Sequence, residues 1–154
     1  DILINNAGIY GPRGMAADGM DYAAWEEVLR VNTLSPLRIS TAFADHIAKG
    51  QMKKIITISS VMGSIAKIDS GGEYIYRSSK AALNMVMRSF AHTIATREVI
   101  VAMFHPGWVK TDMGGTGAAI DVKTSVTGLR KAIAGLSKAD TGCFFNYDGE
   151  PLPW

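Results

Sequence analysis

The chain has 154 residues, of which 47% are hydrophobic and 19% charged, and its formal net charge is +2. This is the balance of an ordinary globular domain, and it excludes a disordered or low-complexity protein. The 16 basic residues are scattered among 14 acidic ones without forming a stripe, so no nucleic-acid partner is expected. The single cysteine, Cys143, excludes an internal disulfide and a thiolate metal cluster.

No stretch approaches the roughly twenty apolar residues of a membrane span, so no membrane partner is expected. The length suits one domain, and we expect residues 1–154 to form a single cytoplasmic domain. The histidines have no metal-ligand spacing with one another or with the cysteine, so no metal site is expected.

Four short apolar runs predict strands, and helical patterns alternate with them along the chain. The runs are rich in Ile, Val and Phe, and their near-continuous apolarity indicates burial on both faces, as in a parallel sheet. The alternation predicts an α/β fold with a Rossmann-type, doubly wound parallel sheet and right-handed βαβ crossovers. In chain order we expect strand 2–4, helices 21–32 and 35–50, strand 54–59, helix 78–98, strand 99–105, helix 121–136 and strand 142–147.

The boundaries of the second predicted helix have simple signals. Ser35 is a preferred N-cap residue, and Pro36 is tolerated in the first turn because its missing N–H has no partner there. Gly50 predicts the end of this helix.

Ligands of such sheets gather at the carboxyl ends of the strands, where loops and helix N-termini converge. The first three strands end in "NNAG" at 5–8, "SSVMG" at 59–63 and "HPGWVKTDMGG" at 105–115. Tyr76 and Lys80 follow the second of these and lie one helical turn apart, so they share a helix face. A positive charge next to a phenol lowers the phenol pKa, and we expect Lys80 to do this to Tyr76.

An ordered set of motifs resembles the short-chain dehydrogenase/reductase family: "NNAG", the Asn of "RVNTLSP", "ITISS", "YRSSK" and "PGWVKT". The resemblance covers nearly the whole chain, and the closing residues resemble the carbonyl-reductase-like members. It implies a Rossmann-type fold that binds NAD or NADP and transfers hydride between the nicotinamide and a small-molecule carbonyl or alcohol. Homo-oligomers are common in the family, so a homo-oligomer is expected.

The sequence resembles the C-terminal, catalytic portion of the family fold, because the family's opening strand, glycine-rich phosphate loop and next βα unit have no counterpart in it. The choice between NAD and NADP is therefore not readable. This difference also leaves an alternative open, in which the chain is a non-catalytic fragment or a signalling or scaffold protein that binds no dinucleotide.

The resemblance implies specific catalytic roles. Tyr76 is the general acid or base, Lys80 binds the nicotinamide ribose, Ser60 holds the substrate oxygen, and Asn32 helps to relay protons through a water. For the serine role Ser64 is an alternative, because the gap between Ser60 and Tyr76 is a little longer than in many members. For Asn32 an alternative is that its amide satisfies the helix end before Ser35. Ser59 is expected to point to the opposite face of its strand and to be structural.

The resemblance also implies cofactor contacts at the ends of the first and third strands. Trp108, Met113 and the glycines that follow are interpreted as a mobile lid or a wall of the substrate pocket, with a plain flexible loop as the alternative. The expected cofactor-binding residues are Asn6, Ala7, Gly8, Tyr76, Lys80, Pro106, Gly107, Val109 and Thr111.

Overall fold

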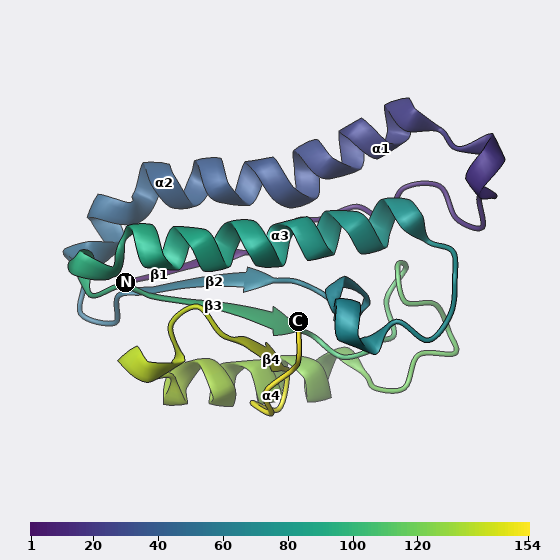
Figure 1. Cartoon of the computed structure of the whole chain (residues 1–154). Helices are drawn as coiled ribbons and strands as arrows, with labels where there is room; N and C mark the ends of the chain where they lie inside the picture. Colours follow the sequence, from purple (N-terminus) through teal and green to yellow (C-terminus); the bar gives the residue numbers. More distant parts are fainter.

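The computed structural model describes all residues, 1–154, and shows one sheet with helices on both faces (Figure 1). All four strands are parallel and lie in the order β1-β2-β3-β4. This confirms the predicted α/β sheet and its four strands, with ends that differ by one or two residues. The strands are β1 Ile2–Asn5, β2 Lys54–Ile58, β3 Ile100–His105 and β4 Phe144–Asn146.

Helices α2 and α3 cover one face of the sheet, α4 covers the other, and α1 packs against α3 (Figure 1). Asp21 caps α1 and Asp121 caps α4, because each carboxylate accepts a hydrogen bond from the backbone N–H three residues later. None of the helices is long and apolar enough to span a membrane. The helices are α1 Tyr22–Leu29, α2 Ser35–Ala48, α3 Tyr74–Thr93 and α4 Val122–Gly135.

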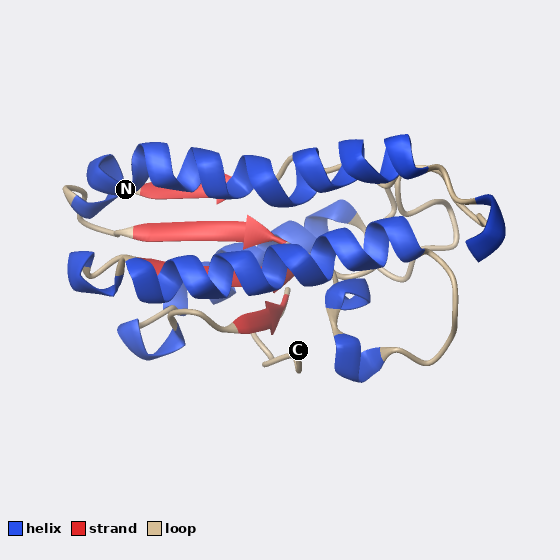
Figure 2. Ribbon diagram, turned by 45° about the horizontal axis from the view of Figure 1, so that its top comes forward, coloured by secondary structure: helices blue, strands red, loops and turns tan.

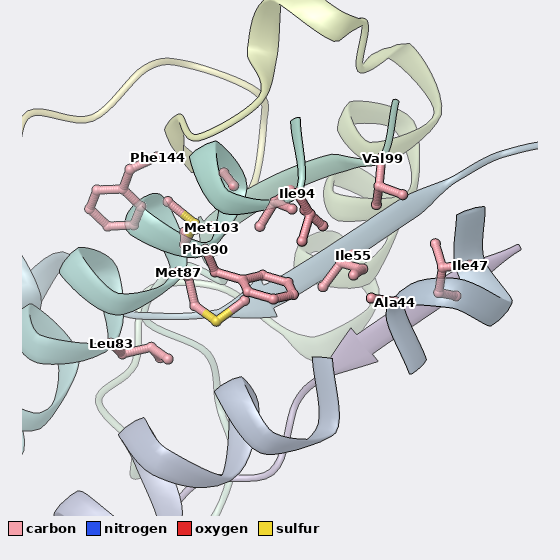
Figure 3. Close-up of a cluster of buried hydrophobic side chains, with 12 residues drawn as sticks. Ala44, Ile47, Ile55, Leu83, Met87, Phe90, Ile94, Val99, Met103 and Phe144 are labelled. Carbon is pink, nitrogen blue, oxygen red and sulfur yellow. The ribbon is translucent and has the colours of Figure 1, made fainter. Parts of the chain in front are cut away.

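The larger core lies between the sheet and the pair α2 and α3 (Figure 3). Ile55 of β2, Met103 of β3 and Phe144 of β4 point to this side, and Leu83 and Met87 of α3 pack against them. The alternate strand residues face α4 and form a smaller core of Ile56, Ala102, Phe104, Ile133 and Phe145. Both faces of β2 and β3 are therefore buried, as their apolar runs predict, but Ile2 and Ile4 of β1 are exposed, so burial on both faces is wrong for β1.

The crossovers do not all have the predicted hand. Three parallel crossovers step along the sheet in one direction, from β1 to β4, but the first two run over one face and the third, through α4, over the other. The third crossover therefore has the opposite hand to the first two, and uniform right-handedness is wrong. The long segment 106–121 between β3 and α4 allows the chain to cross from one face of the sheet to the other.

The predicted break before the second helix is also wrong. The helix continues from α1 into α2 through a π-helical turn, Arg30–Leu34. Ser35 lies within this continuous helix, and its hydroxyl donates to the carbonyl of Arg30 (2.9 Å) instead of capping an N-terminus. The π turn holds one extra residue per turn, so it rotates the side chains of 30–34 relative to a regular helix.

Helix α3 begins four residues before the predicted start. Its first turn contains Tyr74 and Tyr76, and Glu73 before it adopts a left-handed backbone conformation (φ 50°). This conformation is costly for a residue other than glycine, and it turns the chain sharply into the helix.

Candidate functional site

The carboxyl ends of β1, β2 and β3 meet at one edge of the sheet, and the segments that follow them gather there (Figure 2). The N-terminal half of α3 reaches the same edge (Figure 1). The structure therefore brings together the predicted residues Asn32, Ser60, Tyr76 and Lys80 with the loops that begin at 6 and 106.

Tyr76 and Lys80 share the buried face of α3, with exposed fractions of 8% and 4%. The Lys80 ammonium lies 5.7 Å from the centre of the Tyr76 ring and donates a hydrogen bond to the carbonyl of Ile58 (3.0 Å). Burial lowers the pKa of Lys80 to about 8, because the charged form loses its hydration. Lys80 is therefore still mostly protonated at neutral pH.

Lys80 was expected to lower the pKa of Tyr76, but the structure does not show this effect. Burial raises the pKa of Tyr76 above its ordinary value, and the groups that oppose this are a hydrogen bond with Ser60 and the positive charge of Arg13. The Lys80 ammonium is directed to the Ile58 carbonyl. In this structure desolvation of the phenol therefore outweighs its charged neighbours.

Ser60 and Ser59 have separate roles at the end of β2. The Ser60 hydroxyl faces Tyr76 and also accepts from the N–H of Met62 (3.1 Å). Ser59 points to the other side, as strand alternation predicts, and its hydroxyl donates to the amide oxygen of Asn84 on α3 (2.6 Å). Of these two serines, Ser60 is the one next to the phenol.

Asn32 lies in the π-helical turn and is completely buried. Its amide oxygen accepts from the N–H of Ile9 (2.9 Å), and its amide nitrogen donates to the Ile9 carbonyl (2.8 Å) and the Ser79 hydroxyl (3.0 Å). The side chain thus ties the segment after β1 to α3, next to Lys80. It does not satisfy a helix end before Ser35, so that alternative is wrong.

The residues expected to contact a cofactor line the open side of this edge. Asn6 and Ala7 are exposed, and a side chain on Gly8 would lie 3.3 Å from Asn32 Oδ1 and 3.6 Å from Lys80 Nζ. The absence of a side chain at Gly8 therefore leaves the Lys80 ammonium approachable. On the other side, Pro106, Gly107 and Val109 are partly buried and Thr111 is exposed.

Gly107 is required by its backbone and its surroundings. Its φ is 84°, and a Cβ would lie 2.5 Å from Ile120. The carbonyl of Pro106 is held by the hydroxyl of Ser125 on α4 (2.5 Å). The conformation of Gly107 and the hydrogen bond to Pro106 therefore fix the direction in which the loop leaves β3.

Two residues at the site were not predicted from the sequence. The ring of Tyr10 stacks on Tyr76, with centroids 4.3 Å apart and planes 12° from parallel, and the Arg13 guanidinium lies 4.0 Å from the centre of the Tyr10 ring. Arg13 also donates to the carbonyl of Met113 (2.6 Å), in the loop predicted as a pocket wall. Their only sequence signal is their position directly after "NNAG", at a strand exit.

A groove on the surface lies apart from this site. It measures about 720 Å³ and lies between α2 and α3, with Leu37, Val86, Phe90 and Ile94 among its apolar residues. No group of three or more His, Cys, Asp and Glu side chains is arranged to hold a metal ion.

Comparison with known proteins places the chain in a family. The family model described as short chain dehydrogenase matches residues 1–119. The C-signal of Myxococcus xanthus is 40% identical over 154 residues, which is 100% of this chain and 92% of that protein. The chain therefore belongs to the short-chain dehydrogenase family, as its motifs predict.

Solved structures of carbonyl reductases share the fold. The carbonyl reductase Sniffer of D. melanogaster matches with a TM-score of 0.93 and 36% identity over 99% of this chain and 66% of its own. An NADPH-bound carbonyl reductase from chicken fatty liver matches with a TM-score of 0.90 and 38% identity over 99% of this chain and 65% of its own. The chain thus spans about two thirds of the length of these reductases.

Proposed function

We propose that the chain forms the catalytic part of an NAD(P)-dependent oxidoreductase that interconverts a small carbonyl compound and its alcohol, with Tyr76 as general acid and base. The observation that carries this proposal is the buried Tyr76 phenol between the Ser60 hydroxyl and the Lys80 ammonium, at the carboxyl edge of a parallel sheet. Relatives named as dehydrogenases and reductases favour it over the non-catalytic alternative.

The nicotinamide, when bound, supplies or accepts the hydride at the carbonyl carbon. In the direction of reduction, Tyr76 gives its phenol proton to the carbonyl oxygen as negative charge develops there. Ser60 donates a second hydrogen bond to the same oxygen and so keeps it within reach of the phenol. Neither step requires Ser60 to be deprotonated.

Lys80 has two tasks in this proposal. Its ammonium stabilises the phenolate that remains after Tyr76 has given up its proton, and it donates hydrogen bonds to the ribose of a bound cofactor. The open position at Gly8, next to the ammonium, supports an approach of the ribose from that side. Asn6, Ala7, Pro106, Gly107, Val109 and Thr111 line the remaining surface for the cofactor.

Asn32 serves as a positioning residue and as part of the proton path. Both N–H groups of its amide are used in holding Ile9 and Ser79, whereas its amide oxygen accepts only from Ile9 and retains one lone pair. With a pKa of about 8, Lys80 can pass a proton from a water to the phenolate without a large energy barrier.

The apolar groove between α2 and α3 supports a homo-oligomer. Ile39 and Phe43 are exposed on α2, and the exposed Met85 of α3 lines the groove. Exposed apolar surface of this kind is typical of a protein interface. The measured mass in solution tests this part of the proposal.

The test of the catalytic proposal is Tyr76→Phe with Tyr74→Phe as a matched control on the same helix. Tyr74 is 43% exposed, whereas Tyr76 is buried beside Ser60. We expect Tyr76→Phe to lower kcat for NADPH- or NADH-dependent carbonyl reduction by at least about a hundredfold, because the proton donor is lost. Tyr74→Phe should retain activity. Full activity of Tyr76→Phe would show that another group donates the proton.

A further inference from the structure

Arg13 is a positive group at the mouth of the site that no carboxylate of the protein neutralises. None of the four ion pairs includes it, although Arg30 and Arg97 are both paired with acids. Its side chain is exposed, yet two contacts orient it: the Tyr10 ring beneath it and the Met113 carbonyl that accepts from Nη2. A fixed and unpaired guanidinium is preorganised to bind an anion.

The aromatic ring of Tyr10 lies between the Arg13 guanidinium and the ring of Tyr76. Tyr10 is stacked on Tyr76 on one face and on Arg13 on the other. The Arg13 charge also acts to lower the pKa of Tyr76, which agrees with this short separation. A group bound to Arg13 and a carbonyl held by Tyr76 and Ser60 can therefore belong to one small molecule.

One acid lies near this stack. Glu73 is next to Tyr10, and after burial it is the main reason why the pKa of Tyr10 is raised to about 12. It makes no ion pair with Arg13. The remaining N–H groups of Arg13 are thus available to solvent or to a ligand, because a guanidinium has five donors and the Met113 carbonyl takes one.

Resting on the proposed function, we propose that Arg13 anchors a carboxylate of the substrate, so that the site prefers oxo acids and aldehyde acids. The guanidinium and the Tyr76 ring lie 4.0 Å and 4.3 Å from the centre of the Tyr10 ring, so the carboxylate and the reacting carbonyl would be separated by about the sum of these distances. Arginine suits this task because its planar fork can donate two parallel hydrogen bonds to a carboxylate. Tyr10 serves as the spacer that sets the distance from Arg13 to Tyr76.

The test compares two probes that differ in charge and in one methyl group, 4-carboxybenzaldehyde and its methyl ester, methyl 4-formylbenzoate. Arg13→Ala should raise KM for the acid about tenfold relative to the ester, because a charged hydrogen-bonded pair is lost at a partly hydrated site. Arg13→Lys should recover part of this ratio. Arg38→Ala, which removes an exposed arginine on α2, should leave the ratio unchanged.

A second measurement does not depend on turnover. Isothermal titration of the acid into the protein without cofactor should show binding that weakens with added salt and is lost in Arg13→Ala. If both probes are reduced but Arg13→Ala affects them equally, the anchor is refuted and the proposed function stands. If neither probe is reduced but the acid binds through Arg13, the anchor stands and the proposed function fails for this substrate class. Absence of any Arg13-dependent preference for the acid, in either assay, overturns the inference.

Discussion

Replacing Lys80 by methionine tests whether this residue is kept for function at a cost in stability. The side chain is 4% exposed, and burial lowers its pKa from 10.5 to about 8. A shift of this size corresponds to a destabilisation of about 3 kcal/mol at pH 7, where both the folded and the unfolded chain hold the proton. The lost hydrogen bond to the Ile58 carbonyl offsets about 1 kcal/mol, so Lys80→Met should be about 2 kcal/mol more stable than the wild type.

The same shift predicts how stability depends on pH. Between about pH 8 and pH 10.5 the unfolded chain still holds the Lys80 proton while the folded chain releases it, so the free energy of unfolding rises with pH. From pH 7 to pH 9.5 the rise should be about 2 kcal/mol. The measurement stops at pH 9.5 because the pKa values of Tyr76 and Tyr10 are raised in the folded state. At higher pH these tyrosines ionise first in the unfolded chain, which lowers the free energy of unfolding.

Urea unfolding followed by circular dichroism at several pH values measures both effects. Lys80→Met should remove most of the slope between pH 7 and pH 9.5, whereas the exposed control Lys49→Met should retain it. A flat wild-type profile over this range, or a Lys80→Met protein that is less stable at pH 7, would refute the reasoning. Turnover should nevertheless be lost in Lys80→Met, because no ammonium remains to stabilise the phenolate of Tyr76.

Two further substitutions test how the site is held in place. Asn32→Ala removes three hydrogen bonds from a fully buried position and should lower the free energy of unfolding by about 2–4 kcal/mol. The control Asn6→Ala, at an exposed asparagine, should change it by less than about 0.5 kcal/mol. Gly63→Ala places a Cβ 2.7 Å from the backbone of Lys80 and should destabilise by about 1–3 kcal/mol, while Gly71→Ala, which meets no atom within 4 Å, should not. Urea unfolding measures all four, and an unchanged Asn32→Ala or Gly63→Ala protein would contradict the contacts described.

The strands were predictable from the sequence because burial on both faces requires continuous apolar runs, and such runs are visible without a structure. The same holds for the meeting of the segments after β1, β2 and β3, because parallel strands bring their carboxyl ends to one edge. Helix α3 was predicted too short at its start, since Gly71 and Gly72 indicate a turn and no capping residue precedes Tyr74.

Features that depend on contacts between distant segments were not predictable in this way. The sequence at 30–34 continues a regular helical pattern, so it does not reveal the π turn that places Asn32 against Ile9. The stack of Tyr10 on Tyr76 joins residues that are far apart in the chain. The pKa of Tyr76 depends on how deeply the phenol is buried, which a four-residue spacing from Lys80 does not reveal.

Three locally unfavourable features lie on or against the helix that carries Lys80, although Lys53 and Glu98 adopt the same left-handed conformation before β2 and β3. The π turn holds Asn32, Glu73 before α3 has a left-handed backbone, and Gly63 lets a loop touch the backbone of Lys80 itself. Each departs from what local sequence preference favours, and a charged side chain is buried among them. Packing alone would be served better by a regular helix and an apolar residue at position 80. The stability gained by Lys80→Met therefore measures how much the buried Lys80 ammonium costs the fold.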